Sequence, residues 1–580
     1  MSYRGPRLDG AALTQLGVAI AFVVVSIVLP GLLGSEYWSY NFRLVNLFVT
    51  VAVLQNMLLA DAGQVSFGQG AVFGLAAFAT GIVSGLWGYP YAVGFVAGVA
   101  AAIMLGLLFA LPALRVQGYY LGFVTLSAAV VFPELIVAFN GWTNGINGIT
   151  RAVPALTEPI GFGLSWISLI VMAVTAGTLT FHSVLRNSSL GRQMRVAAVS
   201  PEAAVTLGIN PGVLRFIAFT IAAAGTGIAG ALYVPVLGFV SPYAFRVDLS
   251  IFFFFAVIVG GNGQVLGPVI GAWILYLVPN ALLADLANYR LLGYGVVALG
   301  IMMALPDGVV GSVEKFRRTH RLRRAVPAVG VDRVLGWSGD GVSTRAGTAI
   351  RVAGARKNFG RLAALGGVDL QVEAGTVHGL VGPNGSGKTT LLNAISGLIP
   401  LSSGRVTISG TDMTGAAAYR VARLGVGRTF QTPRVLEEMS IWENIEIGAD
   451  FRRAEDGLLA LLEPFRQEWD ENRPDLFAHA QRRMLEVLRT VASRPDILLL
   501  DEPAAGLSAA ERRDFARLIR FLCDRLGKTI VVVEHDLALV WRVADRITVL
   551  DAGVVVAEGA PGDIAADPKV RALFTGTVDA

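Results

Sequence analysis

A glycine-rich loop with the composition of a phosphate-binding site occupies residues 382–390. An apolar run, Val377 to Val381, precedes it as a predicted strand, and Lys388 to Ile395 continues from it as a predicted helix. Such a loop turns backbone N–H groups inward on phosphates, and the helix N-terminus adds positive potential. We expect Lys388 to reach the β- and γ-phosphates of ATP and the Thr389 hydroxyl to ligate Mg²⁺. The predicted nucleotide contacts are Gly382, Pro383, Asn384, Gly385, Ser386, Gly387, Lys388, Thr389 and Thr390.

Two acidic residues, Asp501 and Glu502, end a second predicted buried strand, Ile497 to Leu500. Acids after an apolar strand are common, but these follow a phosphate loop in the chain and precede Pro503. We expect Asp501 to hold Mg²⁺ directly or through water, and Glu502 to polarise the attacking water as a general base. The loop and the acidic pair together predict an ATP hydrolase.

Three further side chains are assigned to the same site. The predicted strand Val531 to Val533 leads to His535, which we expect to contact the γ-phosphate. Gln431 is predicted to sense Mg²⁺ and the apolar first half of the chain. Phe359 could stack on adenine, and packing in the core is a close rival interpretation. The predicted catalytic residues are Glu502, His535 and Lys388, and the predicted metal ligands are Thr389, Gln431 and Asp501.

The part of the chain before about residue 310 is too apolar for a soluble protein. Hydrophobic residues make up 54% of the whole chain and charged residues 15%, and the apolar excess lies in this part. A helix needs about 20 apolar residues to cross a bilayer. We predict ten membrane spans, at 11–33, 41–60, 65–86, 90–113, 118–139, 162–181, 212–238, 247–262, 264–284 and 290–306.

Basic residues flank the predicted spans in a pattern that orients them. Arg4 and Arg7 precede the first span, Arg192 and Arg195 follow the sixth, and a basic run at 315–324 follows the last. Four scattered arginines fall on the opposite side: Arg43, Arg151, Arg246 and Arg290. Loops rich in Lys and Arg stay in the cytoplasm. Ten spans then place both termini and the ATP-binding part on the cytoplasmic side of the cytoplasmic (inner) membrane. We interpret the run at 315–324 as a flank at the lipid bilayer, and the net charge of +5 does not indicate nucleic acid.

Polar residues within or beside the predicted spans are candidates for a solute pathway, because ionisable and polar groups are expensive in a membrane. The candidates are Gln64, Ser66, Gln69, Glu134 and Asn140. Asp61, Glu134 and Asp285 lie near predicted span ends, where a solvated interface is at least as good an interpretation.

The loop between the sixth and seventh predicted spans contains a short capped helix. Ser200 is predicted as its N-cap, Pro201 as its first helical residue and Glu202 as an acidic first turn, with Gly208 at the C-terminal end. A short, rigid helix in a cytoplasmic loop can transmit movement to a second domain, although an ordinary surface helix would have the same pattern. The predicted coupling residues are Glu202, Ala203, Ala204 and Gly208.

Composition divides the chain into three parts. Residues 326–347 lack strong periodicity and are rich in Gly, Ser and Asp, as in a linker. Beyond them β-type and helical runs alternate, which is typical of an α/β domain. We predict a transmembrane permease domain at 1–325, a linker at 326–347 and a nucleotide-binding domain at 348–580. The predicted fold class is a polytopic α-helical membrane domain of about ten spans, fused to an α/β P-loop ATPase domain.

The motifs of the second half resemble the nucleotide-binding domain of ABC transporters. The residues that carry the resemblance are Gly382–Thr390, Gln431, Leu498–Leu507 and His535. The run Asp501-Glu502-Pro503-Ala504-Ala505-Gly506-Leu507 is similar to the ATP-binding subunits of branched-chain amino acid importers.

The membrane half resembles the permease subunits of the same importers. The segments that carry this resemblance are 63–68, 143–148, 190–192, 203–210 and 260–271, and the helix near 202–208 resembles the EAA motif by which importer permeases dock on the ATPase. The family usually keeps the two parts as separate chains, so this chain resembles a fusion of them.

The resemblance implies a cofactor set and partners. It implies ATP and Mg²⁺, a second permease/ATPase half in a heterodimer, an extracytoplasmic solute-binding protein, and a small-molecule solute such as a branched-chain or related amino acid. The alternatives are half of an ABC exporter, or a channel or sensor regulated by ATP.

One segment departs from the family. The ABC signature, Leu-Ser-Gly-Gly-Gln or a close variant, aligns with Phe477, Ala478, His479, Ala480 and Gln481, with Gln481 placed 20 residues before Asp501. Alanine has no hydroxyl to donate, and His479 adds bulk where glycine leaves room. In an ABC dimer each signature serves the partner's P-loop. We therefore expect an asymmetric motor, in which this chain's own Lys388, Glu502 and His535 work with a partner's intact signature. The rival interpretation is that the altered segment makes the whole assembly inactive or specialised.

Overall fold

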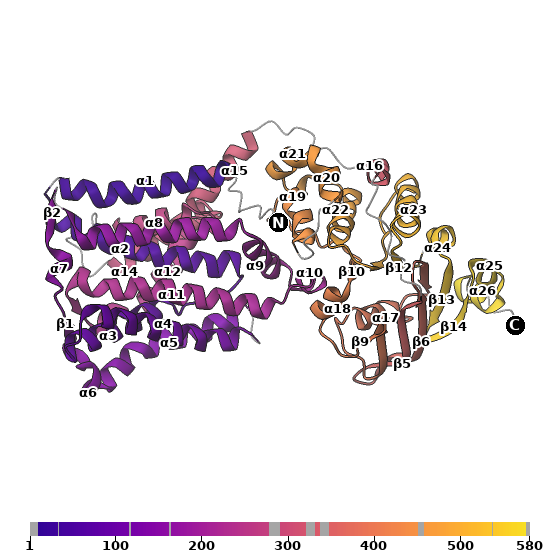
Figure 1. The fold of residues 1–580 in the computed structure, drawn as a ribbon, viewed down its shortest axis with the longest axis horizontal. Coiled ribbons are helices and arrows are strands. Elements are labelled where there is room, and N and C mark those ends of the chain that lie inside the picture. The colour runs from indigo at the N-terminus through magenta and orange to yellow at the C-terminus, as the bar shows by residue number, and fades with distance from the viewer. Residues whose placement is uncertain are drawn as a thin grey trace. The chain divides into compact units, whose positions relative to one another are not determined.

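The computed structural model of the chain describes residues 10–32, 34–114, 118–161, 164–277, 290–320, 331–336, 347–450, 457–535 and 537–575 (Figure 1). It separates into two compact units. The first, which we call the membrane unit, comprises Met1–Ala198 and Pro211–Leu322. The second, which we call the ATPase unit, comprises Val199–Asn210 and Arg323–Ala580. Residues 199–210 of the loop between the sixth and seventh predicted spans thus belong to the ATPase unit.

Long helices that run side by side make up the membrane unit (Figure 1). They are α1 (Gly10–Leu32), α2 (Glu36–Asn56), α3 (Gln69–Gly81), α4 (Tyr91–Ala113), α5 (Tyr119–Ala138), α8 (Trp166–Arg186), α11 (Pro211–Leu237), α12 (Val247–Gly260), α13 (Gly267–Leu277), α14 (Arg290–Ala304) and α15 (Gly308–His320). Shorter elements connect them, including α6 (Asn140–Thr143), α7 (Pro154–Thr157), α9 (Ser189–Val199), and the antiparallel pairs β1 (Ile149–Thr150) with β4 (Phe239–Val240) and β2 (Pro159–Gly161) with β3 (Leu164–Ser165).

Among the described residues, nine helical runs are long and apolar enough to cross a membrane. Each of the nine overlaps one of the predicted spans. The remaining prediction, 264–284, coincides with α13, which has 11 residues. The part of that prediction after residue 277 lies outside the described residues, as do Arg4, Arg7 and Asp285.

Small residues let the membrane helices approach closely. A Cβ atom added at Gly106 of α4 would lie 2.1 Å from the Ala223 Cβ of α11, and one at Gly227 of α11 would lie 2.6 Å from the Ala102 Cβ. Only glycine permits such contacts, which maximise van der Waals packing where no hydrophobic effect drives association.

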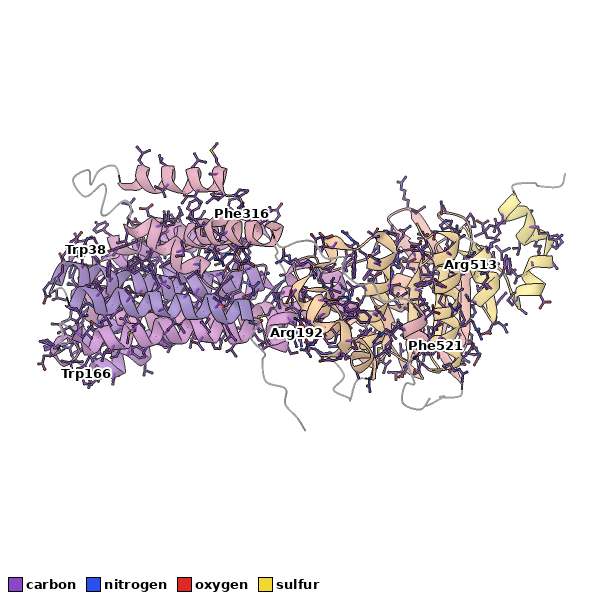
Figure 2. The ribbon with its side chains drawn as sticks, turned by 90° about the horizontal axis from the view of Figure 1, so that it is seen from above. Trp38, Trp166, Arg192, Phe316, Arg513 and Phe521 are labelled. Atoms are coloured by element: carbon purple, nitrogen blue, oxygen red, sulfur yellow. The ribbon has the colours of Figure 1, made fainter. Side chains whose placement is uncertain are left out.

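Two exposed tryptophans and one arginine mark the two ends of the membrane unit. Figure 2 shows the exposed tryptophans Trp38 and Trp166 at one end of its helices and Arg192 at the other. Aromatic side chains favour the bilayer interface, and arginines favour the cytoplasmic side.

The polar residues predicted to line a pathway lie in two environments. Gln64, Ser66 and Gln69 are buried, and the Gln69 Oε1 accepts a hydrogen bond of 2.7 Å from the Thr226 Oγ1 of α11. Glu134 and Asn140 are exposed.

Asp61 is not solvated, contrary to the interface interpretation. It is 2% exposed, and its carboxylate accepts from Arg186 at 2.5 Å and contacts the His182 Nε2 at 2.8 Å. A buried carboxylate needs such partners because its water has been removed. His182 and Arg186 lie on α8, which packs beside the end of α2. No sequence pattern predicted this contact.

The described strands of the ATPase unit form two sheets. The six-stranded sheet has the order β10-β11-β12-β7-β13-β14 and is parallel except for the β13–β14 pair. Its strands are β10 (Val426–Arg428), β11 (Ile497–Asp501), β12 (Thr529–Glu534), β7 (Val377–Val381), β13 (Arg546–Asp551) and β14 (Val554–Gly559). The antiparallel sheet has the order β6-β5-β8-β9, with β6 (Leu362–Glu373), β5 (Thr348–Phe359), β8 (Ser403–Ile408) and β9 (Thr411–Asp412).

Helices cover the parallel sheet on both faces, which explains why β7, β11 and β12 are buried at every residue and read as continuous apolar runs. The described helices of the ATPase unit are α10 (Pro201–Thr206), α16 (Val331–Leu335), α17 (Lys388–Ile395), α18 (Ala418–Leu424), α19 (Ile441–Ala449), α20 (Gly457–Leu462), α21 (Arg466–Glu471), α22 (His479–Ala492), α23 (Ala509–Asp524), α24 (Leu537–Val543), α25 (Pro561–Ala566) and α26 (Pro568–Thr575).

The predicted linker contains a helix that we did not expect. In α16, Val331 and Val334 are buried in the core of the ATPase unit, and the Asp332 Oδ1 accepts from Arg517 of α23 at 2.7 Å. The guanidinium of Arg333 lies 4.6 Å from the ring centroid of Phe465. Five residues carry too little periodicity to predict a helix; packing stabilises this one. Residues 326–330 and 337–346 of the predicted linker lie outside the described residues.

Candidate nucleotide site

The strand order brings the predicted site residues to one edge of the parallel sheet. Asp501 of β11 pairs with Val533 of β12, and Glu534 of β12 pairs with Val381 of β7. The residues that follow these strands therefore emerge together at the carboxyl edge, where α/β sheets bind ligands.

The glycine-rich loop needs glycine at specific positions. A Cβ atom at Gly382 (φ +154°) would lie 2.0 Å from the Leu550 carbonyl oxygen. Gly387 (φ +100°) is the N-cap of α17, and a Cβ atom there would lie 2.6 Å from the Ala364 carbonyl oxygen. A side chain at either position would push the loop away from β13 or β6.

Lys388 lies at the base of this loop. It is 6% exposed, and its Nζ donates to the carbonyl oxygens of Gly382 and Pro383, both at 2.8 Å. Burial lowers the pKa of the ammonium, and the charges of Glu502 and Asp501 oppose that shift. Thr389 is exposed and Thr390 is half-buried, so the Thr389 hydroxyl is accessible to a cation beside the loop.

Asp501 has the properties of a cation ligand. It is 2% exposed, and its Oδ1 has no hydrogen-bond partner. Burial raises the pKa of this carboxyl, and the neighbouring Arg428 acts in the opposite direction. A buried carboxylate oxygen without a partner is costly, and a cation or its bound water would satisfy it. The residues present therefore fit Mg²⁺.

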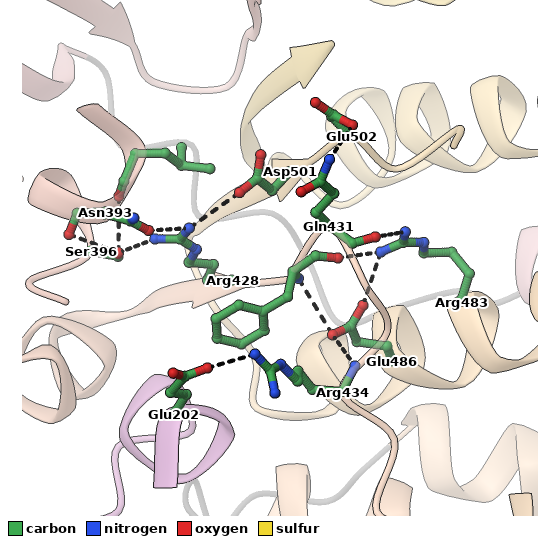
Figure 3. Close-up of polar contacts among 12 residues, drawn as sticks. Glu202, Asn393, Ser396, Arg428, Gln431, Arg434, Arg483, Glu486, Asp501 and Glu502 are labelled. Atoms are coloured by element: carbon green, nitrogen blue, oxygen red, sulfur yellow. Dashed lines mark hydrogen bonds and ion pairs between the residues drawn. The ribbon is translucent and has the colours of Figure 1, made fainter. Parts of the chain in front are cut away.

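Arg428, at the end of β10, holds the other oxygen of Asp501 in place. Its Nη2 lies 3.3 Å from the Asp501 Oδ2 and 2.6 Å from the Asn393 Oδ1, and its Nη1 lies 2.5 Å from the Ser396 Oγ (Figure 3). One buried guanidinium thus joins Asp501 to the helix that follows the glycine-rich loop.

Glu502 lies between two other residues predicted for the site, Gln431 and His535. The Gln431 Nε2 donates to the Glu502 Oε2 at 2.8 Å, and the His535 Nδ1 lies 3.7 Å from the same oxygen. Glu502 has a φ of +43°, a conformation that costs about 1–3 kcal/mol for a residue with a side chain. Such strain is typical of residues whose direction matters for function.

Phe359 does not pack in the core, so that rival interpretation is wrong. The ring lies at the end of β5 and is 50% exposed, with the Lys357 Nζ 5.1 Å from its centroid. An exposed ring beside a lysine is free to stack on a planar ligand.

The segment aligned with the ABC signature caps α22. Phe477 is buried, Ala478 is the N-cap, and the Gln481 Oε1 accepts from the Ala478 N–H at 3.1 Å. The alanine has no side-chain oxygen, so half of a capping box is missing. The exposed His479 fills the space next to Gly506, where an added Cβ atom would lie 3.2 Å from the imidazole.

The predicted coupling helix, α10, has the expected cap, because the Ser200 side chain accepts from the Ala203 N–H at 3.3 Å. It packs within the ATPase unit, where Ala203 and Ala204 are fully buried. The Glu202 Oε2 lies 2.8 Å from the Arg434 Nη2, and the Gly208 carbonyl accepts from the Arg423 Nε of α18 at 3.0 Å.

Sequence reasoning missed the residues that support this site. They are Asn393, Arg423, Arg428, Arg434, Arg483 and Glu486. A signal existed on α22, where Arg483, Glu486 and Arg489 recur at every third residue and so share one helix face. The spacing does not say that the face is buried.

Two family models match the chain. Residues 37–305 match the permease component of branched-chain amino acid transport systems, and residues 365–505 match the ABC transporter model. The ATP-binding protein BraF for high-affinity branched-chain amino acid transport, from Pseudomonas aeruginosa, is 34% identical over 248 residues, which cover 39% of this chain and 97% of that protein. LivG, a protein of the same description from Escherichia coli, is 34% identical over 249 residues, with the same coverage of 39% and 97%.

Solved structures match the same part of the chain. A nucleotide-free ATP-binding cassette from an ABC transporter is 28% identical and covers 39% of this chain and 99% of that one, with a TM-score of 0.36. The sequence matches and the parallel sheet with its glycine-rich loop agree on the class of the second half, and the permease match accounts for the apolar helices of the first.

Proposed function

Because the chain belongs to the family of branched-chain amino acid ABC transporters, as a fusion of its permease component with its ATP-binding component, we propose that it imports branched-chain or related amino acids. The coarser activity follows from the family: a membrane protein that couples ATP hydrolysis to transport. What we propose beyond this activity is that transport is inward and that the solute is a branched-chain or related amino acid.

The observation that carries the proposal is a continuous line of contacts from the permease loop to the nucleotide site. The fully buried Ala203 and Ala204 hold α10 in the ATPase unit, and the exposed pair of Glu202 with Arg434 adds to that contact. Gln431, three residues before Arg434, donates a hydrogen bond to Glu502. A movement of Glu502 or of a nucleotide beside it would reach α10 through a segment of six residues, 429–434. A coupled transporter needs such a link between its nucleotide site and its permease loop, and the vesicle experiment below separates it from a channel gated by ATP.

At the site itself we assign roles from position. Lys388 and the loop N–H groups would hold the phosphates, and Thr389, Asp501 and Gln431 would hold Mg²⁺. When bound, Mg²⁺ neutralises charge on the β- and γ-phosphates. Glu502 would accept the proton of water while the water oxygen bonds the γ-phosphorus and the β–γ bridging bond breaks, which leaves ADP and inorganic phosphate. His535 would steady the γ-phosphate.

The segment 477–481 supports an asymmetric motor. Ala478 and His479 lack the hydroxyl and the bare backbone that a partner's nucleotide would meet. We therefore infer a second permease/ATPase half with an intact signature, and a solute-binding protein that delivers the amino acid. We place the chain in the cytoplasmic membrane, with both termini and the ATPase unit inside.

The proposal is tested with the complex purified through an affinity tag on this full chain, reconstituted in vesicles with MgATP. We expect ATP-dependent accumulation of a branched-chain amino acid against its gradient when the binding protein is added. Equilibration without accumulation would point to a channel, and solute extrusion to an exporter. For the asymmetry, Lys388→Ala should abolish ATPase activity. If activity survives Lys388→Ala but vanishes when the partner's P-loop lysine is replaced, the assignment of the working site is wrong.

A further inference from the structure

Two buried, oppositely charged residues on α22 grip the backbone of the segment 429–434, which we call the glutamine loop. We propose that Arg483 and Glu486 are positioning residues that fix this loop, so that Gln431 meets Glu502 on one side and Arg434 meets Glu202 on the other. Only the second contact rests on the proposed function.

Arg483 binds the carbonyl side of the loop. Its Nη1 donates to the Phe430 carbonyl and its Nη2 to the Gln431 carbonyl, and its side chain is fully buried (Figure 3). A planar guanidinium presents two parallel donors, so it fixes the relative direction of two consecutive carbonyls; an ammonium offers no such fork.

Glu486 binds the amide side of the same loop. Its Oε1 accepts from the Phe430 N–H at 3.4 Å and from the Arg434 N–H at 3.0 Å, and its Oε2 lies 3.3 Å from the Arg483 Nη1. Phe430 is thus bound through both its N–H and its carbonyl. The two side chains hold the loop at both ends.

The electrostatics show why both charges are required. Burial raises the pKa of Glu486, and the positive charges of Arg489 and Arg483 oppose that shift. Burial lowers the pKa of Arg483, and the negative charge of Glu486 opposes that shift. A buried charge that loses its partner is strongly destabilising. Arg483 and Glu486, which we call the clamp, therefore hold the loop by buried charge-assisted bonds that water cannot replace, in contrast to the exposed pairs of the surface.

The placement of the clamp gives it a functional role. Gln431 and Arg434 leave the same short backbone, one towards Glu502 at 2.8 Å and the other towards Glu202 at 2.8 Å. A shift of the loop would misplace both side chains together. The N-terminal end of α22 lacks the signature residues of the family. The middle of the helix carries the clamp and so supports this chain's own nucleotide site.

The neighbouring residue Arg482 provides a matched control. It lies on the same helix and is 31% exposed, and it binds Glu437 at 3.0 Å and the carbonyl oxygens of Phe477 and Asp475 at 3.0 and 3.3 Å, all of them outside the glutamine loop. We would compare Arg483→Lys, Glu486→Gln and Arg482→Lys in the tagged complex. Each change is conservative in volume, and thermal unfolding establishes that the variants fold.

The first measurement is hydrogen exchange of the complex without nucleotide, resolved at residues 430–434. We expect Glu486→Gln to speed exchange of the Phe430 and Arg434 amides by about tenfold, since one charge-assisted acceptor becomes neutral. Arg482→Lys should leave them unchanged. Unchanged protection in Glu486→Gln, or equal loss in Arg482→Lys, would overturn the clamp whatever the transporter carries.

The second measurement is ATPase kinetics. Arg483→Lys should lower kcat by roughly 10- to 100-fold, as expected of a small misplacement, while the KM for MgATP stays within about threefold because Lys388 is untouched. If Arg483 acts through Gln431, adding Arg483→Lys to Gln431→Ala should lower kcat no further. A fall in the melting temperature with unchanged kcat, or fully additive effects, would show a merely structural role. Should Arg483→Lys fail to fold, the same cycle with Glu486→Gln decides.

Discussion

The two kinds of contact that hold α10 in the ATPase unit have different strengths, and this difference makes a prediction. The Glu202–Arg434 pair has a 2.8 Å contact, but its side chains are 58% and 48% exposed. The Coulomb energy at that distance in water is about 1.5 kcal/mol, and measured values for exposed pairs fall to roughly 0.2–1 kcal/mol once entropy and screening act. By contrast, Ala203 and Ala204 have 0% exposure.

A larger side chain at Ala203 should therefore disturb docking more than loss of the ion pair. Leucine at a fully buried alanine position overpacks it, at a cost of about 1–3 kcal/mol, which corresponds to roughly a 5- to 150-fold change in the docked fraction. We expect Ala203→Leu to uncouple the transporter, so that ATP is hydrolysed with little uptake. Glu202→Ala should retain most of the coupling.

The assay is the number of solute molecules accumulated per ATP hydrolysed in vesicles that contain the tagged complex. Glu202→Leu is the matched control, because it places the same side chain one residue away at an exposed position. The reasoning fails if Glu202→Ala lowers the ratio as much as Ala203→Leu, or if Ala203→Leu leaves the ratio unchanged.

Three further predictions concern the nucleotide-binding half. Glu502→Gln should preserve MgATP binding and stall turnover; undiminished uptake would contradict a role for Glu502 as the base. Gly382→Ala should weaken MgATP binding roughly tenfold or more through strain, since its Cβ atom would lie 2.0 Å from the Leu550 carbonyl, whereas Gly562→Ala, which meets nothing within 4 Å, should not. Burial depresses the pKa of His378 from 6.5 to about 4, so the folded state binds fewer protons than the unfolded one. The contribution of the neutral His378 to the free energy of unfolding is therefore fully present above pH 6.5 and is lost as the pH falls to 4, a loss of at most about 3 kcal/mol. The melting temperature should therefore fall between pH 6.5 and pH 4, and His378→Gln should reduce that fall. An identical pH profile of the melting temperature in the two proteins would argue against a role for His378.

The sequence by itself determined those features whose physics is local. Residues 377–395 read as strand, glycine-rich loop and helix because each part is contiguous in the chain. The Ser200 cap and the apolar helices follow from hydrogen bonding and burial within short segments. The sequence could also predict that Asp501, Glu502 and His535 lie together, because parallel strands present their carboxyl ends at one edge of the sheet.

The tertiary structure alone decided which distant side chains support that site. Arg428 meets Asp501, Arg483 meets the glutamine loop, and His182 meets Asp61 across separations of 73, 53 and 121 residues. A charged residue has the same appearance in a sequence whether it is solvated or buried against a carbonyl, because its environment is created by chain segments that folding brings together. For the same reason α16, too short to be stable alone, is visible only where α23 covers it.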